Sequence, residues 1–393
     1  MGKATSSNIL DLRELQRYVD GNDDLHDALG APRGTHLPLA PFAQGEYNAN
    51  YELKVPAASG RQPAEGIEGA GRAAEGGAAR ADFDADAAGG RYLLRVNLGS
   101  QMHLADQIGY EAAALHLLEG SGRTPRVLYV DGSRSHIPHG VLVEELLPGR
   151  PLVYETDLPH AARILADVHA QPVPADAPLV TPAHPLAAVV DECTDMFGVY
   201  RAWPHADPAV LARVDKLFER AQAIARADRA RPAPTRRHIV NTELNSSNFL
   251  MNDDMPATGQ TDEGAPAAMC AADYLIDWEK PVLGEVEQDL AHFLAPTTTF
   301  WKTDTILTRA EMEAFLTAYE EAVAGRFALA GMRKRFEEYL VVTCLRGITW
   351  CAMALTEYLG ASRAATNADT LVKIRAYLEP EFLDFIAREY YGM

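Results

Sequence analysis

Two short stretches hold the residues whose types and spacing could do chemistry. The first, VNTELNSSNFLMN at 240–252, places Glu243 and Asn248 on one polar loop before a short apolar run. The second, IDWE, places Asp277 at the end of a strand-like segment. Mg²⁺ prefers octahedral oxygen ligands, often one or two carboxylates with phosphates and water. These positions predict that Asn248 and Asp277 supply metal ligands and that Glu243 faces a substrate.

A purely structural interpretation of the same stretches is open at this point. Asn245 and Asn248 are residue types that form turns, and Asp277 could cap the segment that follows it. Both interpretations account for the loop taken alone.

Residues before this loop could bind phosphate. Gly45 lies between two strand-like runs in AQGEYNANYEL, and Asn48 is a second position that tolerates a left-handed backbone. Arg95 is a cation within the apolar run YLLRV, and Glu111 borders the apolar face of the next helical pattern. A pair formed by Arg95 and Glu111 would hold a cation against phosphate oxygens, as the strand–helix ion pair of kinases does.

The elements that must position these residues begin with strands. A helix is expected over 8–18, two strands around a turn over 37–55, and a third strand over 91–97. Residues 57–90 are rich in Ala, Gly and charge, which indicates a disordered insertion within a hairpin. A helix over 104–118 and strands at 126–130 and 140–146 follow, before the breaker Pro148-Gly149.

Beyond that breaker the pattern is mainly helical. Asp157 is expected to cap a helix that follows it, and a second polar insertion at 252–272 separates two short strands. The apolar run over 339–359 is interrupted by Thr343, Arg346 and Thr349, which indicates a buried helix and not a membrane span. The predicted division is a nucleotide-binding lobe at 1–147 and a helical lobe at 148–393 that carries the catalytic hairpin.

Composition excludes some functions. The net charge is −19, with 29 Arg and 7 Lys, so the chain would repel a nucleic-acid backbone. The acidic excess also suggests a salt-adapted protein, and no secretory signal is recognised, so a cytoplasmic location is expected. The four cysteines have neither metal-ligand nor redox spacing and are expected to be buried apolar residues.

The order of these features resembles the aminoglycoside phosphotransferase and choline kinase family, small-molecule relatives of protein kinases. The resemblance covers about 37–294 and rests on the ordered set of glycine loop, strand cation, helix glutamate, VEELLPG hinge, Asp/Asn loop and IDWE. It implies an α+β, two-lobed, protein-kinase-like fold. The N-terminal lobe would have a small antiparallel sheet with one helix, and the C-terminal lobe would be larger and mainly helical.

The resemblance also implies roles for single residues. The family's loop His-Gly-Asp-Leu-His-x-Gly-Asn maps onto 241–248, which makes Glu243 the catalytic residue. Asn248 and Asp277 become the Mg²⁺ ligands, and the backbone of Glu145 and Leu147 would hold adenine. Glu279 matches the last residue of the family's IDFE and IDWE variants. Asp289 resembles an aspartate that supports the catalytic loop, although a helix-terminus cap explains it equally well.

Three positions depart from the family pattern. Arg95 stands for a lysine, Asn241 for a histidine and Glu243 for an aspartate. Arg95 keeps the positive charge, although Arg and Lys bind differently. Glu243 is one methylene longer, and a misplacement of about 1 Å can cost roughly a hundredfold in rate.

The function expected from the resemblance is ATP- and Mg²⁺-dependent phosphoryl transfer to a hydroxyl of a small-molecule metabolite. The cofactor-binding residues would be Gly45, Asn48, Arg95, Glu111, Glu145 and Leu147. The alternative is a kinase-like nucleotide-binding regulatory protein without phosphoryl transfer. The partner would be a small-molecule alcohol, with no nucleic acid and no membrane. The identity of the acceptor, the choice between ATP and GTP, and the oligomeric state are open.

Overall fold

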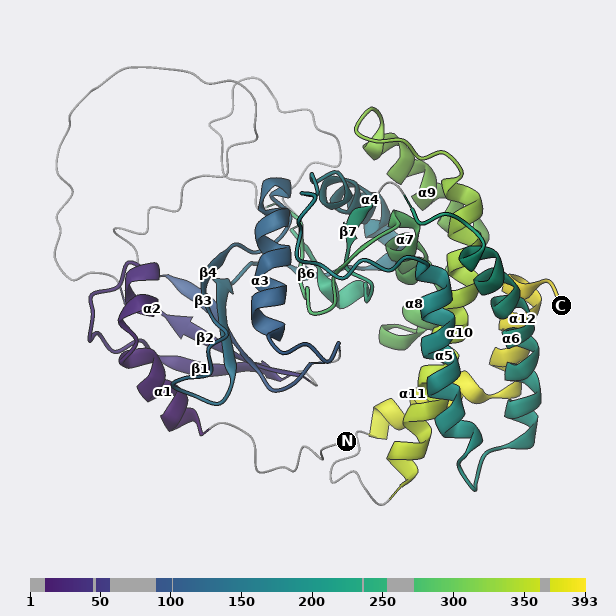
Figure 1. Cartoon of the computed structure of the whole chain (residues 1–393), viewed down its shortest axis with the longest axis horizontal. Coiled ribbons are helices and arrows are strands. Elements are labelled where there is room, and N and C mark those ends of the chain that lie inside the picture. Colours follow the sequence, from purple (N-terminus) through teal and green to yellow (C-terminus); the bar gives the residue numbers. More distant parts are fainter. Residues whose placement is uncertain are drawn as a thin grey trace. The chain divides into compact units, whose positions relative to one another are not determined.

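The computed structural model describes residues 11–44, 47–56, 90–100, 102–234, 237–252, 272–360 and 368–393. The chain divides into two compact units (Figure 1). The first is Met1–Gly149 with Asn252–Glu279, and the second is Arg150–Met251 with Lys280–Met393. Gly45 and, except for end residues, the two predicted insertions at 57–90 and 252–272 lie outside the described residues.

The first unit is built on an antiparallel sheet of strand order β1-β2-β3-β5-β4. The strands predicted over 37–55, 91–97, 126–130 and 140–146 are therefore present. Their bounds are β1 (Leu39–Gln44), β2 (Asn48–Lys54), β3 (Arg91–Asn97), β4 (Val127–Asp131) and β5 (Gly140–Glu145). The first unit also contains β9 (Tyr274–Leu275) and the 3₁₀ turn η1 (Glu119–Ser121).

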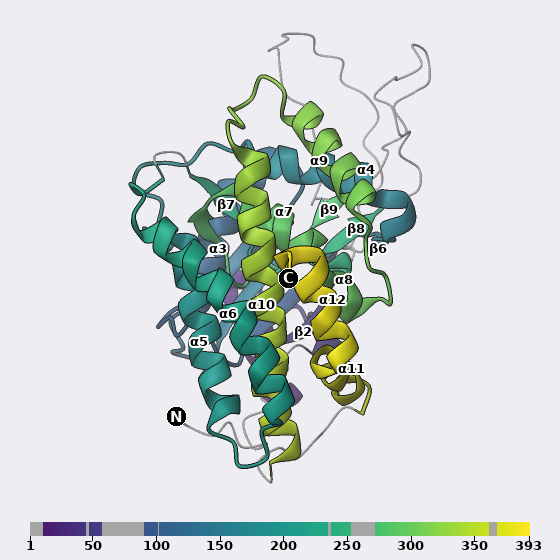
Figure 2. The ribbon, with the colours of Figure 1, turned by 90° about the vertical axis from the view of Figure 1, so that its right-hand side faces the viewer.

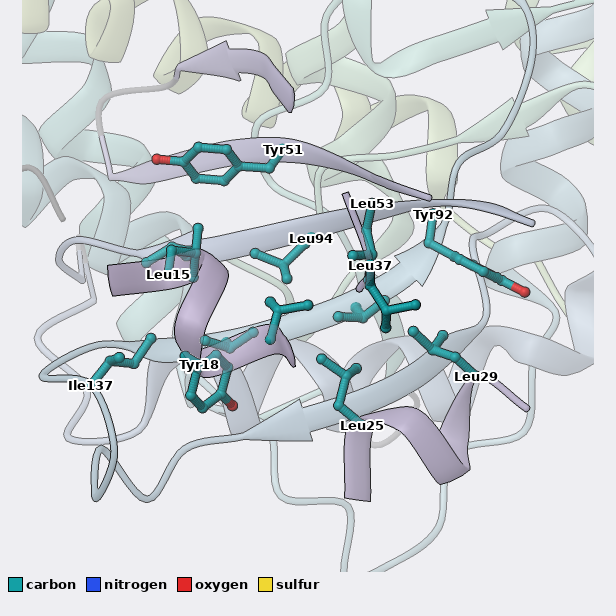
Figure 3. Close-up of a cluster of buried hydrophobic side chains, with 14 of the residues drawn as sticks. Leu15, Tyr18, Leu25, Leu29, Leu37, Tyr51, Leu53, Tyr92, Leu94 and Ile137 are labelled. Carbon is teal, nitrogen blue, oxygen red and sulfur yellow. The ribbon is translucent and has the colours of Figure 1, made fainter. Parts of the chain in front are cut away.

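One face of this sheet carries the apolar core of the first unit (Figure 3). Leucine and tyrosine side chains of β2 and β3, among them Leu53 and Leu94, pack with residues of α1 (Leu12–Asp20) and α2 (Asp23–Ala28). Successive strand residues point to opposite faces. Leu94 on the core face therefore places its neighbour Arg95 on the other face.

Helix α3 (Gln107–Leu118) contacts β4 and β5 and carries Glu111. Figure 1 shows it on the opposite side of the sheet from α1 and α2. The helix predicted over 104–118 begins three residues late, because the Asp106 side chain caps it by accepting the N–H of Gly109. In the same way Asp11 caps α1 within the region predicted as helix.

The second unit is mainly helical, as predicted. Its helices are α4 (Tyr154–His169), α5 (Pro185–Arg201), α6 (Pro208–Arg229), α7 (Val286–Leu294), α8 (Pro296–Lys302), α9 (Arg309–Val323), α10 (Met332–Leu359), α11 (Ala368–Leu378) and α12 (Pro380–Tyr391). Helix α10 runs through the centre of this unit, with α5 and α6 on one side and α11 and α12 on the other (Figure 2).

Helix α10 is also the one helix, among the residues described, that is long and apolar enough to cross a membrane. Of its most apolar window 67% is buried inside the protein. The helix predicted over 339–359 is thus a buried core helix, as expected. The cysteines Cys193, Cys344 and Cys351 are free and buried, which confirms their predicted role, whereas Cys270 is outside the described residues.

Short strands complete the second unit. β6 (Arg150–Pro151) pairs with β8 (Phe249–Met251), and β7 (His238–Val240) pairs with β10 (Val282–Gly284). The 3₁₀ turn η2 (Ser246–Asn248) immediately precedes β8.

The capping role predicted for Asp157 is wrong. Helix α4 begins three residues earlier, at Tyr154, so Asp157 lies in its first turn. Its carboxylate accepts the N–H of Val153 at 2.8 Å and pairs with Arg150 at 2.6 Å. A carboxylate near a helix N-terminus is favourable there without being the cap.

Candidate active site

The loop at 241–248 is held by one buried carboxylate of the second unit. Asp289, on α7, accepts the backbone N–H of Asn241 at 2.8 Å and of Thr242 at 2.7 Å. His169 lies 3.2 Å from the same carboxylate. Asp289 is fully buried and caps no helix through its side chain. It therefore supports the loop, which was one of its two predicted roles.

The loop is strained at the position where the family pattern has glycine. Thr242 has a φ of 74°, in the left-handed region that β-branched residues avoid. Its N–H is bound to Asp289, and its hydroxyl donates to the carbonyl of Lys280 at 2.9 Å. Such strain persists only where surrounding contacts over-determine the conformation, and it clusters at functional sites.

The side chain of Asn248 shapes the turn that follows. Its Oδ1 accepts the N–H of Asn245 at 2.8 Å, and Asn245 in turn accepts the N–H of Ser247 at 3.0 Å. The turn-forming role predicted as an alternative is thus real. It does not exclude ligation, because an amide oxygen has a second lone pair.

Glu243 lies within a cluster of four charged side chains. Arg346 of α10 donates from Nη2 to its Oε1 at 3.1 Å, and Lys280 Nζ lies 3.5 Å from the same oxygen. Both cations also pair with Glu192 of α5, Arg346 at 3.0 Å and Lys280 at 3.6 Å. We name Glu192, Glu243, Lys280 and Arg346 the charge cluster.

The charge cluster fixes the ionisation of Glu243. Burial raises its pKa, but the positive charges of Arg346 and Lys280 outweigh burial and lower the pKa to about 2. The carboxylate is therefore ionised at every physiological pH. It can orient a hydroxyl and accept a hydrogen bond from it, but its intrinsic basicity is low.

In the first unit, Arg95 and Glu111 form the predicted ion pair. Arg95 Nη1 donates to Glu111 Oε1, and both side chains are almost fully buried. Arg95 also lies 3.6 Å from Asp277 and 3.4 Å from Glu279. Asp277 has a φ of 67° and a side chain that is 45% exposed.

This part of the first unit holds more negative than positive charge. Burial raises the pKa of Glu111 to about 7, and the charge of Arg95 only partly offsets it. Burial raises the pKa of Glu144 to about 7 in the same way, and burial together with Asp277 does so for Glu279. Oε2 of Glu111 is buried without a hydrogen-bond partner among the described residues.

That charge imbalance fits a bound cation. Within the described part of the chain, no group of three or more His, Cys, Asp or Glu residues could hold a metal ion alone. Mg²⁺ needs only one or two protein carboxylates when nucleotide phosphates supply further ligands. Asp277, the most exposed of the carboxylates around Arg95, is suited to that role.

Of the other predicted cofactor-binding residues, Asn48 needs a correction. It opens β2 and is not among the residues with positive φ, so the left-handed backbone expected for it is wrong. Its side chain instead forms hydrogen bonds within the first unit: it donates to Glu279 Oε1 and accepts from Asn97 Nδ2 at 3.0 Å. Strand pairing, which requires an extended backbone, determines this conformation.

The predicted hinge residues lie at the end of β5. Glu145 is half-buried, and its carboxylate accepts from Arg126 Nε at 2.7 Å. Its backbone N–H donates to the carbonyl of Arg126. Leu147 is half-buried beyond the strand. Their contact with adenine stays a prediction, and Gly45 is outside the described residues.

Sequence reasoning did not assign Glu192, Lys280, Arg346 or Glu144 to a site. One signal was available for Arg346, a charged residue within the apolar run predicted as a buried helix over 339–359. Buried charges are paired, so a partner could have been sought. Nothing local marks Glu192 or Lys280.

Comparison with known proteins agrees with the expected family. A sequence model of the phosphotransferase enzyme family matches residues 70–261. A search of curated proteins by sequence found no match. The resemblance to the aminoglycoside phosphotransferases and their kinase relatives is confirmed by this family match and by the solved structures below.

Several solved structures share the fold. A putative aminoglycoside phosphotransferase from Ralstonia eutropha JMP134 has a TM-score of 0.57 at 12% identity, covering 95% of this chain and 98% of that one. A spectinomycin phosphotransferase with ADP and spectinomycin has 0.52 at 11%, covering 91% and 94%. An ethanolamine kinase from Plasmodium vivax has 0.51 at 14%, covering 88% and 83%. The predicted protein-kinase-like fold is confirmed by these structures, and the family match supports a phosphotransferase.

Proposed function

Since the chain matches the phosphotransferase enzyme family and has the kinase-like fold, we propose that it transfers the γ-phosphoryl group of ATP to a hydroxyl of a small molecule. The observation that carries the proposal is the buried ion pair between Arg95 of β3 and Glu111 of α3. A buried cation held by a carboxylate from a neighbouring helix has the arrangement that binds nucleotide phosphates in kinases.

The nucleotide would be held by the first unit. Arg95, oriented by Glu111, would bind phosphate oxygens, and its Nε has no hydrogen-bond partner among the described residues. Asn248 and Asp277 are proposed as the protein ligands of Mg²⁺, which neutralises the charge of the transferred group. Glu145 and Leu147 are proposed to hold the adenine through their backbone.

The acceptor hydroxyl would be oriented by Glu243. Its longer side chain is held at its far end by Arg346 and Lys280. A glutamate can take the place of the shorter aspartate if Arg346 and Lys280 determine where its carboxylate oxygens lie. With a pKa of about 2 it would contribute alignment more than proton abstraction, in keeping with a reaction catalysed mainly by positioning and charge.

The second candidate is a nucleotide-binding protein without phosphoryl transfer. It is favoured by one observation, that the Glu243 carboxylate is already engaged by two cations. The two candidates share the nucleotide site and differ only in turnover. A cytoplasmic location is proposed for both.

The deciding experiment measures Mg·ATP binding by calorimetry and phosphate transfer to a panel of small alcohols. We expect binding, and transfer to at least one alcohol. Asp277→Ala should abolish turnover, because a metal ligand is lost, and Glu243→Gln should lower kcat about a hundredfold with little change in the KM for ATP. Binding without transfer to any alcohol would favour the second candidate. Unchanged activity of Asp277→Ala would refute the metal assignment.

A further inference from the structure

The second unit contains a cavity of about 150 Å³ beside the candidate catalytic loop. Three members of the charge cluster, Glu192, Lys280 and Arg346, line it, and so does Thr242, the neighbour of Glu243. The rest of the wall includes apolar residues of α5 and β10, further residues of α10, and His292 and Gln288 of α7.

The two cations of this wall have hydrogen-bond donors to spare. Lys280 Nζ lies 3.5 and 3.6 Å from its two carboxylate partners, which is longer than a good hydrogen bond. Arg346 uses Nε and Nη2, whereas its Nη1 makes no hydrogen bond to any residue that the structure describes. An anionic group entering the cavity would find these donors available.

A third residue of the wall, Gln288, has a hydrogen-bond acceptor without a donor among the described residues. Oε1 of Gln288 is buried and accepts no hydrogen bond within the described part of the chain. Leaving a buried acceptor without a donor is unfavourable. A ligand that brings a hydroxyl to this atom would remove that cost.

Charge decides the class of ligand. The charge cluster has two carboxylates and two cations, so it is neutral as a whole, and each carboxylate is paired with both cations. Burial and the charge of Arg346 lower the pKa of His292 to about 4, so this side chain is neutral at pH 7. A cationic ligand would meet Lys280 and Arg346 without a free carboxylate to pair with, whereas an anion would meet the unused donors.

We propose that this cavity binds the acceptor and that the acceptor is a small alcohol carrying an anionic group, a carboxylate or a phosphate. The anionic group would bind Lys280 and Arg346, a hydroxyl would donate to Gln288, and a second hydroxyl would lie beside Glu243. An apolar cavity of about this volume holds a ring of six carbon atoms. Since Ala188 of the wall is exposed, part of the ligand can extend beyond the cavity, so the acceptor would have roughly six to ten non-hydrogen atoms. The assignment deepens the function proposed above and rests on it.

The reaction then balances without a further reactant. The acceptor oxygen forms a bond to the γ-phosphorus of ATP as the bond from that phosphorus to ADP breaks. The hydroxyl proton leaves to solvent as the new bond forms, while Glu243 holds the hydroxyl in line by accepting its hydrogen bond. The products are a phosphate ester, ADP and a proton.

Binding to the full-length protein, measured by calorimetry without nucleotide, tests the ligand class. The probes are glycerate, glycerol 3-phosphate, glycerol and ethanolamine at one ionic strength. We expect glycerate or glycerol 3-phosphate to bind at least about tenfold more tightly than glycerol, since only these two probes can form charge-assisted hydrogen bonds with Lys280 and Arg346. Ethanolamine should bind most weakly. Preference between the first two probes identifies carboxylate or phosphate as the anionic group.

Two variants locate the binding. Ala188→Leu places a larger side chain at the cavity wall, where Ala188 is exposed, and should weaken glycerate binding at least tenfold. Val199→Leu, at an exposed position of α5 away from the cavity, is the matched control and should change nothing. Gln288→Leu should weaken binding of the hydroxy acid while leaving Mg·ATP binding unchanged.

The outcomes separate this inference from the function on which it rests. If glycerate binds, Ala188→Leu abolishes this binding, and no alcohol is phosphorylated, then the cavity is an anion site but the proposed kinase function is wrong. Transfer to glycerol or ethanolamine as efficiently as to glycerate, unaffected by Ala188→Leu and Gln288→Leu, would leave the kinase standing and overturn the anion site.

Discussion

At the residue scale, Glu243 maps onto the aspartate of the family pattern that the sequence resembles, and the structure shows how the longer side chain is held. Arg346 and Lys280 hold the glutamate by its oxygens. The extra methylene alone would let the carboxylate move, but a partly buried ion pair with two cations restricts it. Side-chain length is thus compensated by contacts from Arg346 of α10 and from Lys280, two residues before β10.

Removing Arg346 tests its role as a positioning residue. In Arg346→Gln the pKa of Glu243 should rise from about 2, because burial raises this pKa and the positive charge that lowers it most, that of Arg346, is then absent. The acidic limb of the pH dependence of kcat should therefore move to higher pH, with kcat lowered about tenfold to a hundredfold at pH 7.

The measurement is a series of pH–rate profiles for the wild type, Arg346→Gln and Arg346→Lys. The lysine variant keeps a charge and should restore part of both kcat and the pH limb. A lower kcat with an unmoved acidic limb in Arg346→Gln would mean that Arg346 only stabilises the fold.

The lowered pKa of His292 leads to a separate prediction about how stability depends on pH. Its folded pKa is lowered to about 4, whereas an unfolded histidine titrates near 6.5. The unfolded state therefore binds the proton first, so stability is fully present above pH 6.5 and is lost as the pH falls towards 4. The loss should be on the order of 2–3 kcal/mol for this group.

Urea unfolding at several pH values between 4 and 7 measures this loss. His292→Gln should flatten the slope of unfolding free energy against pH, whatever its effect at pH 7. His205→Gln, at an exposed position of the same unit, is the control and should keep the wild-type slope. Equal slopes in all three proteins would show that His292 does not titrate as described.

At the scale of elements, the catalytic loop depends on α7. Asp289 pairs two backbone N–H groups of the loop, and one of these belongs to Thr242 in its left-handed conformation. The loop that follows β7 is thereby fixed by helix α7, nearly fifty residues later in the chain. The strain at Thr242 is sustained by these bonds and would relax without them.

Asp289→Ala should lower the free energy of unfolding by about 2–5 kcal/mol, since two buried donors lose their acceptor. It should also lower kcat, because the loop that carries Glu243 is no longer held. Urea denaturation and steady-state kinetics measure the two effects. Asp195→Ala, at an exposed position of α5, should stay within about 0.5 kcal/mol of the wild type. A loss no larger than that of the control would show that the loop holds itself.

At the scale of the whole molecule, the net charge of −19 is the dominant electrostatic feature. Like charges repel across the folded surface, and the Debye length shrinks from about 30 Å at 0.01 M to about 8 Å at 0.15 M salt. Exposed ion pairs such as Arg201–Asp215 are weakened by the same screening, but each contributes only about 0–1 kcal/mol. Screening of the repulsion between the excess negative charges should therefore outweigh the loss of these ion pairs, so that added salt stabilises the fold.

The melting temperature should rise as KCl is increased from 0.01 to 0.5 M. Differential scanning calorimetry measures it, and NaCl at matched ionic strength separates screening from a specific effect of potassium. A melting temperature that is unchanged or falls with salt would remove the basis for salt adaptation.

Local patterns predicted most of the fold at the level of elements. An alternating pattern predicted β1 and β2, and short strand-like runs predicted β3, β4 and β5, because strand character depends on consecutive residues. Helix starts were less accurate, as at α3 and α4, because capping depends on which side chain bonds to the first turn. Helices α5 and α6 were foreseen only as part of a helical region.

The sequence by itself determined the class of fold and the order of Arg95, Glu111, the Asn241–Asn248 loop and Asp277, because residue type and spacing along the chain are sufficient for both. Only the tertiary structure decided how Glu243 is held. Its contact with Arg346 joins residues 103 positions apart, and no periodicity encodes such a pairing. The same holds for Asp289 and the strained Thr242. Long-range hydrogen bonds and ion pairs form only once helices pack, and in this protein they determine which residues can act in the site.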